Sequence, residues 1–294
     1  MEEKQGLLLQ GIGGFYYVEA EGTVYECKAR GVFRKKKQKP LAGDHVTLLL
    51  EDGTATITEL LPRKNSLIRP PLANMDQLFL VSSVRDPSPN LLVLDKMIAV
   101  AEDKNIEPVV IFSKTDLGDA APLVDLYRRV GLPVIAVSQT SPDGIEEIRS
   151  RLKGKVSAFA GNTGVGKSTL LNRISTAFQR ETGEISQKLG RGRHTTRSAE
   201  LLKLDCGGYV ADTPGFSTVD IERYDMVKKD DLQYAFREFS PYLGTCKFQS
   251  CAHIGEKGCA VCAAVERGEI AKSRHDSYVS MYNEVKDIKE WQRK

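Results

Sequence analysis

The sequence predicts a chain of three parts: a small β-barrel, an α/β domain on a mostly parallel sheet, and a helical region with a cysteine cluster. Short aromatic and β-branched runs separated by turns fill the beginning of the chain, and alternating strand-like and helix-like segments follow them. Four of the six cysteines lie between Cys246 and Cys262. A length of 294 residues fits two or three domains. We place their boundaries at residues 1–70, 71–220 and 221–294.

The composition is that of an ordinary globular chain, with 41% hydrophobic and 28% charged residues. No apolar run reaches about 18 residues, so we expect no membrane span and no membrane partner. The first residues, MEEKQGLLLQG, lack the pattern of a secretory signal. We therefore expect a cytoplasmic protein, and we expect it to be a monomer. The net charge of +3 is too small to indicate nucleic-acid binding, so any basic surface must be local.

The barrel is predicted from strand-like runs joined by tight turns. Residues 14–20 (GFYYVEA) and 23–29 (TVYECKA) flank one short turn, and residues 44–50 and 54–60 flank an Asp-Gly turn. An Asp-Gly pair between such runs favours a hairpin. Several strands at this spacing favour a small barrel, which the prolines after Arg69 bring to an end.

The α/β domain is predicted from apolar runs that alternate with helical patterns. Residues 77–84 (QLFLVSSV) and 107–113 (EPVVIFS) have the composition of strands buried in a parallel sheet. Residues 91–105 between them have helical spacing. Further strand-like runs occupy residues 133–138, 156–160 and 208–212. Beyond Asp220 the chain becomes helical and charged, interrupted by the cysteine cluster.

A phosphate-binding loop is predicted at residues 161–168, which read GNTGVGKS and match GxxxxGK[ST] between a strand-like run and a helical pattern. Backbone N–H groups of such a loop surround phosphates, and Gly164 and Gly166 keep side chains away from them. Lys167 would neutralise the β- and γ-phosphates, and the Ser168 hydroxyl would bind Mg²⁺. The residues expected at the nucleotide are Gly161, Asn162, Thr163, Gly164, Val165, Gly166, Lys167, Ser168 and Thr169.

The segment DTPG, from Asp212 to Gly215, matches the DxxG element of GTPases. In that element the Asp orients Mg²⁺ through water, and the Gly amide senses the γ-phosphate. A strand-terminal Asp in a turn is a weak signal alone. After a phosphate-binding loop it is a strong one.

The choice of base is predicted from Ser113-Lys114-Thr115-Asp116, which resembles NKxD. The Asp116 carboxylate would accept from guanine N1–H and N2–H₂, a pair of donors that only guanine offers, while the Lys114 stem stacks along the base. Ser113 stands where Asn is usual, and we expect this change to cost a supporting hydrogen bond between loops. Ser138, at the end of the next strand, would pack behind the base as the remnant of a SAK element.

The order of these motifs is unusual, because the NKxD-like element comes 45 residues before the phosphate-binding loop begins. In ordinary GTPases it follows both that loop and DxxG. The sequence therefore predicts a circularly permuted GTPase. The chain would leave this domain directly after DTPG, the segment that moves on hydrolysis.

A switch element is predicted at residues 190–197, GRGRHTTR. Its threonine should bind Mg²⁺ beside the γ-phosphate; Thr195 and Thr196 are both candidates, and the spacing favours Thr196. Phe216 follows DTPG where many GTPases carry the glutamine that orients water. His194 is the best-placed group to position water instead. The alternative is a surface histidine in a basic loop.

The cysteine cluster predicts a structural zinc site. Its candidate ligands, three thiolates and one imidazole within fourteen residues, are Cys246, Cys251, His253 and Cys259. One alternative is a Cys₄ site in which Cys262 replaces His253, and another is a reduced cluster without metal. We favour the first set, because zinc takes four ligands and Cys262 falls where a helix would begin.

A basic stretch, KARGVFRKKKQK at residues 28–39, has seven basic residues and no acid. On a barrel edge it would form a positive ridge suited to a phosphate backbone, although such runs are often only solvated. Beside a barrel and a zinc module, RNA is the better interpretation. The ridge would centre on Arg34, Lys35, Lys36 and Lys37.

Together these residues resemble the bacterial RsgA (YjeQ/YloQ) family of small-ribosomal-subunit biogenesis GTPases. The resemblance covers nearly the whole chain and is carried by FRKKK, LAGDHV, IRPP, SKTD, GNTGVGKS, GRGRHTTR, DTPGF and CKFQSCAHIGEKGC. It implies an OB-fold barrel, a permuted GTPase domain and a zinc domain, with GTP/GDP, the small (30S) subunit and its rRNA as partners. It also implies zinc at Cys246, Cys251, His253 and Cys259 and a catalytic His194.

Two interpretations from other classes stay open beside this one. A P-loop ATPase or nucleotide kinase keeps the phosphate chemistry but leaves Asp116 unexplained, and competition between GTP and ATP separates the two. A GTP-dependent RNA-binding protein without significant turnover is the other alternative. Hydrolysis measured with and without small ribosomal subunits decides it.

Overall fold

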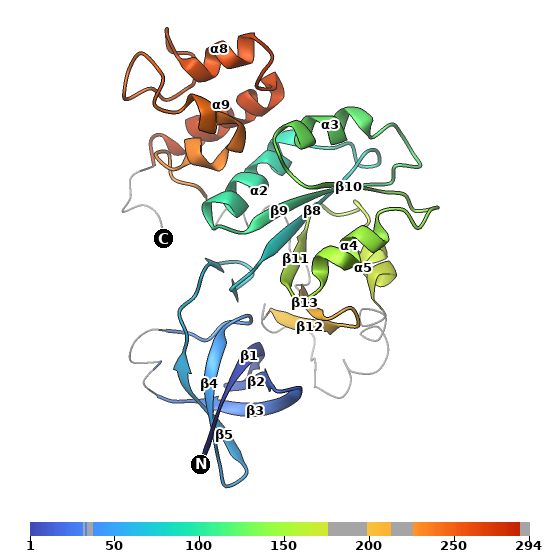
Figure 1. Cartoon of the computed structure of the whole chain (residues 1–294), viewed down its shortest axis with the longest axis vertical. Helices are drawn as coiled ribbons and strands as arrows, with labels where there is room; N and C mark the ends of the chain where they lie inside the picture. The colour runs from blue at the N-terminus through green and yellow to red at the C-terminus, as the bar shows by residue number, and fades with distance from the viewer. Residues whose placement is uncertain (32, 34–37, 176–198, 213–225, 289–294) are drawn as a thin grey trace. The chain divides into compact units, whose positions relative to one another are not determined.

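The computed structural model describes residues 1–31, 33, 38–175, 199–212 and 226–288 (Figure 1). The chain divides into two compact units. Unit 1 comprises Met1–Leu78, Ile145–Phe159 and Lys167–Phe216, and unit 2 comprises Phe79–Gly144, Ala160–Gly166 and Ser217–Lys294. The boundaries expected at residues 70 and 220 stay predictions.

Unit 1 begins with a closed five-stranded barrel in the order β1-β2-β3-β5-β4, which confirms the expected barrel. Its strands are β1 (Glu2–Ile12), β2 (Phe15–Ala20), β3 (Thr23–Ala29), β4 (His45–Glu51) and β5 (Thr54–Leu60). Neighbours are antiparallel except β3 and β5, which run parallel and close the barrel. Alternate residues point inward, so that Leu8, Val18, Val46, Leu48 and Ile57 are fully buried.

The barrel continues into a short hairpin of β6 (Ser66–Leu67) and β7 (Leu72–Ala73). Backbone carbonyls just before β4 join the two parts, because that of Ala42 accepts from the Ala73 amide at 2.9 Å and that of Gly43 accepts from Asn74 Nδ2 at 2.9 Å. Gly43 is required here: its φ is +94°, and a Cβ would lie 2.0 Å from the Ala73 carbonyl oxygen.

Six strands form one sheet in the order β10-β9-β8-β11-β13-β12. They are β8 (Gln77–Ser83), β9 (Glu107–Ser113), β10 (Val134–Val137), β11 (Val156–Ala160), β12 (Glu200–Leu204) and β13 (Gly208–Asp212). β10 and β9 pair in parallel, as do β11 and β13, whereas β12 and β13 are antiparallel. If the strands are numbered from β11 and β8, β9 and β10 are counted after β13, their order across the sheet is 2-3-1-4-5-6. The chain instead enters this sheet at β8, so the connections between strands are permuted while the order of the strands in the sheet is unchanged.

Four helices belong to these strands: α2 (Leu91–Asp103), α3 (Ala121–Arg129), α4 (Ile145–Leu152) and α5 (Lys167–Ile174). The Asn90 side chain caps α2 by accepting from the Val93 amide. In unit 1, Arg149 of α4 donates to the carbonyls of Ile174 at 2.9 Å and Arg173 at 3.0 Å, which ties α4 to the end of α5.

The C-terminal region of unit 2 is helical, as expected, and is drawn in orange and red in Figure 1. It contains the 3-10 helices η3 (Leu232–Ala235) and η4 (Arg237–Tyr242) and the α-helices α8 (Ala260–Glu266) and α9 (Lys272–Val285). Phe236, Phe239 and Tyr278 form its apolar centre, with ring centroids 4.8 to 5.3 Å apart. No helix in the described part of the chain is long and apolar enough to cross a membrane.

A buried ionic network fastens this region to α2 and α3. Arg274 of α9, with its side chain 1% exposed, donates to Asp95 of α2 at 2.6 Å and to Glu238 of η4 at 2.7 Å. The Tyr127 hydroxyl of α3 donates to the same Asp95 oxygen at 2.9 Å. Burial raises the pKa of Asp95, and the adjacent Arg274 opposes that shift. The carboxylate is therefore stable in this place only with its cation.

Candidate nucleotide site and metal cluster

The predicted phosphate-binding loop lies between β11 and α5. Its glycines are required by the backbone: φ is +153° at Gly161, +85° at Gly164 and +91° at Gly166. A Cβ at Gly161 would also lie 2.2 Å from the carbonyl oxygen of Val81 in β8. At Gly161 the backbone of the loop therefore packs directly against the sheet and leaves no room for a side chain.

The helix α5 begins at Lys167, directly after this loop. Ser168 and Thr169 in its first turn are accessible from solvent, so their hydroxyls are open to a ligand. Lys167 is partly buried, and burial lowers the pKa of its ammonium group. A phosphate bound beside this ammonium would favour its charged form and oppose the lowering of its pKa.

The end of β9 supports the loop, and here the sequence expectation was wrong. Ser113 was expected to cost a hydrogen bond, but its hydroxyl makes one: it donates to the Val165 carbonyl at 2.6 Å and lies 3.3 Å from the Ser82 carbonyl. Ser113 is buried, so this bond is protected from water. Lys114 follows with φ +57° and donates through Nζ to the backbone carbonyl of Asp86.

Hydrogen bonds hold the Asp116 carboxylate, which follows β9, in a fixed orientation. Its Oδ1 accepts from the Gln139 amide at 2.8 Å and from the Ser138 hydroxyl at 3.2 Å. The Gln139 amide contributes most to a lowered Asp116 pKa, so the group is a carboxylate at neutral pH. The Thr115 amide bonds to the Val137 carbonyl at 3.3 Å and holds the turn to β10. Sequence reasoning identified Ser138 and missed Gln139. Gln139 donates through its backbone amide, which every residue except proline has, so its residue type does not indicate this role.

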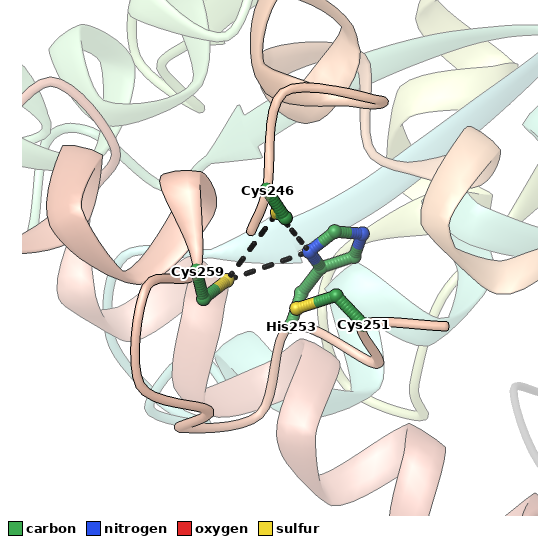
Figure 2. Close-up of side chains that lie close together, drawn as sticks. All are labelled: Cys246, Cys251, His253 and Cys259. Carbon is green, nitrogen blue, oxygen red and sulfur yellow. Dashed lines mark hydrogen bonds between the residues drawn. The ribbon is translucent and has the colours of Figure 1, made fainter. Parts of the chain in front are cut away.

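The predicted metal ligands converge in the C-terminal region (Figure 2). One donor atom from each of Cys246, Cys251, His253 and Cys259 lies within 4.8 Å of the others. His253 Nδ1 is 3.5 Å from Cys246 Sγ and 3.4 Å from Cys259 Sγ, and these two sulfurs are 4.0 Å apart. Zinc bonds are about 2.3 Å to sulfur and about 2.05 Å to nitrogen. In a tetrahedral site they place a sulfur and a nitrogen about 3.6 Å apart and two sulfurs about 3.8 Å apart. The cluster therefore fits a tetrahedral metal ion.

Groups around the cluster orient its donors. His253 Nε2 lies 3.0 Å from Gln233 Oε1, which fixes the ring so that Nδ1 faces the sulfurs. The amide of Ala260 donates to Cys246 Sγ at 3.2 Å and stabilises a thiolate. Cys262 is not one of the four; its sulfur lies 3.9 Å from His275 Nε2, which favours the Cys₃His set over Cys₄.

Burial affects the protonation of the metal-free thiols. It raises the pKa of Cys251 to about 12 and that of Cys259 to about 11. Both groups are therefore protonated at neutral pH without metal, and a bound ion must displace their protons.

Several predicted site residues lie outside the described part of the chain, and their roles stay predictions. They are His194, Thr195, Thr196, Gly215 and Phe216, together with Arg34, Lys35, Lys36 and Lys37. Asp212 is described only as the last residue of β13. That position puts it at the end of a strand that pairs in parallel with β11, the strand before the phosphate-binding loop.

Comparisons with known proteins agree over nearly the whole chain. The family model described as RsgA GTPase matches residues 60–222, and that of the RsgA N-terminal domain matches residues 5–57. A protein of Caldanaerobacter subterraneus subsp. tengcongensis, named small ribosomal subunit biogenesis GTPase RsgA, is 47% identical over 291 residues, 98% of this chain and 97% of the relative.

Two solved structures share the fold. YjeQ from Thermotoga maritima has a TM-score of 0.82 at 36% identity, over 98% of this chain and 100% of its own. YloQ, described as a circularly permuted GTPase, has a TM-score of 0.81 at 34% identity, over 98% and 96%. The family model covers more than half of the sequence, and the permuted strand order accords with it. The chain belongs to the RsgA GTPase family.

Proposed function

We propose that this chain binds GTP, hydrolyses it with water to GDP and phosphate, and assists late maturation of the small ribosomal subunit, which stimulates the hydrolysis. The observation that carries the proposal is the orientation of the Asp116 carboxylate, which Ser138 and Gln139 hold by hydrogen bonds. Asp116 belongs to the same compact unit as residues 161–166 of the phosphate-binding loop, to which Ser113 is hydrogen-bonded. An ionised, fixed carboxylate fits the two donors on the guanine edge. The related proteins are named for the same activity.

In this proposal the phosphate-binding loop supplies backbone donors, and Lys167 neutralises the β- and γ-phosphates. The hydroxyls of Ser168 and Thr196 would hold Mg²⁺, with Asp212 acting on it through water. Bound Mg²⁺ supplies charge stabilisation between the phosphates. His194 would position the attacking water, since the phenylalanine after DTPG has no polar group.

The nucleotide assignment is tested by exchanging one carboxylate for an amide. Asp116→Asn replaces an acceptor by a donor toward the base, so preference should move from GTP to xanthosine triphosphate. Competition among GTP, ATP and xanthosine triphosphate for the wild type and the variant measures this preference. Unchanged GTP affinity in the variant would show that Asp116 does not read the base.

Hydrolysis is tested separately from binding. Phosphate release from GTP, measured with and without purified small ribosomal subunits, should rise strongly when subunits are present. Tight GTP binding with no turnover in either condition would instead establish a GTP-dependent RNA-binding protein, the second candidate function. ATP hydrolysis in place of GTP hydrolysis would contradict both.

We further propose that the cluster of three cysteines and one histidine holds one structural zinc ion, because all four donors are protein groups and none leaves a position for water. The basic residues 34–37 would bind rRNA phosphates, so subunit binding should weaken steeply with salt. The chain would act as a monomer in the cytoplasm, where ribosomal subunits are assembled. Co-sedimentation with small subunits over a range of salt concentrations tests the rRNA contact.

A further inference from the structure

A further thiol lies directly beside the metal cluster. Cys262 is not one of the four predicted ligands, and it comes three residues after the ligand Cys259. Cys259 caps the start of α8, where its sulfur accepts from the Cys262 amide at 3.4 Å. The Cys262 sulfur itself lies 3.9 Å from His275 Nε2. The proposed zinc site makes no use of this thiol.

The backbone between the two cysteines suits a disulfide, which requires Cα atoms about 4.4–6.8 Å apart. Ala260 and Val261, which separate Cys259 from Cys262, are the first two residues of α8. The Ala263 amide donates to the Cys259 carbonyl at 3.1 Å and closes this helical turn. In an α-helix, Cα atoms three residues apart are separated by about 5 Å. Cys259 and Cys262 can therefore be joined while the helix keeps its backbone.

The two thiols differ in their access to solvent. Cys259 is only 4% exposed, whereas Cys262 is partly exposed. A reagent in solution therefore reaches Cys262 first. Burial raises the pKa of Cys262, so this thiol reacts slowly with a reagent from solution. A following exchange with the adjacent Cys259 is intramolecular and therefore fast.

We propose that Cys262 is an oxidation site, which releases the zinc ion by forming a disulfide with Cys259. The oxidant is a low-molecular-weight disulfide, RSSR. The Cys262 thiol gives its proton to water and its sulfur attacks one sulfur of RSSR, so that a mixed disulfide forms and RS⁻ leaves. The Cys259 thiolate then attacks the Cys262 sulfur, the bond between the two cysteines forms, and the second RS⁻ leaves. The two cysteines lose two electrons, and RSSR gains them.

This reaction removes one of the four zinc ligands, because the thiolate is the form of cysteine that binds a metal. Cys246, Cys251 and His253 stay behind as an incomplete set for a structural ion. Reduction of the disulfide by thiols restores Cys259 as a ligand. The inference rests on the proposed zinc site, since it describes how that site would lose its ion under oxidising conditions.

Zinc release from the full chain tests this reaction. Reduced, zinc-loaded protein is incubated without oxygen with glutathione disulfide, and a chromogenic chelator reports free zinc. The wild type should release its zinc, and peptide mapping by mass spectrometry should find Cys259 linked to Cys262. Cys262→Ser should hold as much zinc as the wild type in the reduced state and release it at least about tenfold more slowly. Cys206→Ser is the matched control, because Cys206 is the other partly exposed cysteine outside the four ligands, and its release should equal that of the wild type.

The outcomes separate this inference from the zinc assignment. If the reduced wild type holds no zinc, the proposed zinc site fails and the inference fails with it. If the wild type holds zinc but Cys262→Ser releases it equally fast, only the inference fails. A mixed disulfide at Cys262 that leaves zinc in place would also overturn it. Loss of zinc from reduced Cys262→Ser would show that Cys262 is itself a ligand, which contradicts the inference as well.

Discussion

Replacing Ser113 by alanine removes the hydrogen bond between the end of β9 and the phosphate-binding loop. The hydroxyl donates to the Val165 carbonyl at 2.6 Å, and both residues are buried. Leaving a buried acceptor unpaired costs about 1–3 kcal/mol. In the free protein the loop can relax and hydrate that carbonyl, whereas bound phosphates hold the loop in place. The unpaired carbonyl therefore destabilises the GDP complex more than the free protein. GDP affinity should fall by about 5- to 150-fold.

Equilibrium titration with a fluorescent GDP analogue measures this loss for the wild type, Ser113→Ala and Ser113→Asn. The asparagine variant restores the residue that is usual at this position, and its amide can donate to the same carbonyl, so its affinity should stay close to that of the wild type. Thermal unfolding of the nucleotide-free variants checks that each is folded. The reasoning is refuted if alanine binds GDP as tightly as serine does, or if alanine and asparagine lose affinity equally.

The other predictions concern turnover, metal and stability. Lys167→Ala should abolish tight nucleotide binding, whereas His194→Ala should preserve binding and slow subunit-stimulated phosphate release by about 10²–10⁴-fold; full activity would remove the histidine from the mechanism. Reduced protein should contain one zinc per chain. All three ligand thiols lose a proton on binding, and burial raises the pKa of two of them, Cys251 to about 12 and Cys259 to about 11. Zinc affinity should therefore fall by about a thousandfold per pH unit on acidification from neutral pH, and chelator competition that shows no pH dependence would contradict this. Arg274→Met should destabilise the fold by about 3–5 kcal/mol in urea unfolding, because two buried carboxylates lose their cation, whereas exposed Lys272→Met on the same helix should have little effect.

Much of the architecture could be predicted from local patterns. The Asp-Gly turn, the buried strands of the sheet and the α2 helix all show their period or turn chemistry within a few residues, and the structure has each of them. One strand of the barrel and one of the sheet were missed. β1 mixes exposed polar residues with a short apolar stretch, so only its pairing with β2 and β4 identifies it as a strand. β12 has the same difficulty, since it is an edge strand with a single neighbour, β13.

The functional site also has parts that local sequence patterns indicate and contacts that they do not. The phosphate-binding loop and the cysteine cluster each lie in one short segment, so spacing alone was enough to propose them. The contacts that orient the functional groups join distant residues: Ser113 and Val165 are 52 residues apart, and His253 and Gln233 are 20 apart. No local pattern relates such pairs, because the fold alone brings them together. The serine in place of asparagine was therefore interpreted as a loss, although the structure shows that it makes the bond.

The network around Arg274 also has a consequence for how the chain is made. Asp95 is synthesised 179 residues before its cation, which at about 5–20 residues per second is a delay of roughly 9 to 36 seconds. During that interval the carboxylate has no arginine in its place, and α2 cannot be buried against α9. Unit 2 therefore completes its core only when α9 has left the ribosome. A chain that stops before Lys272 would lack Tyr278, so the rings of Phe236 and Phe239 that pack against it would be exposed.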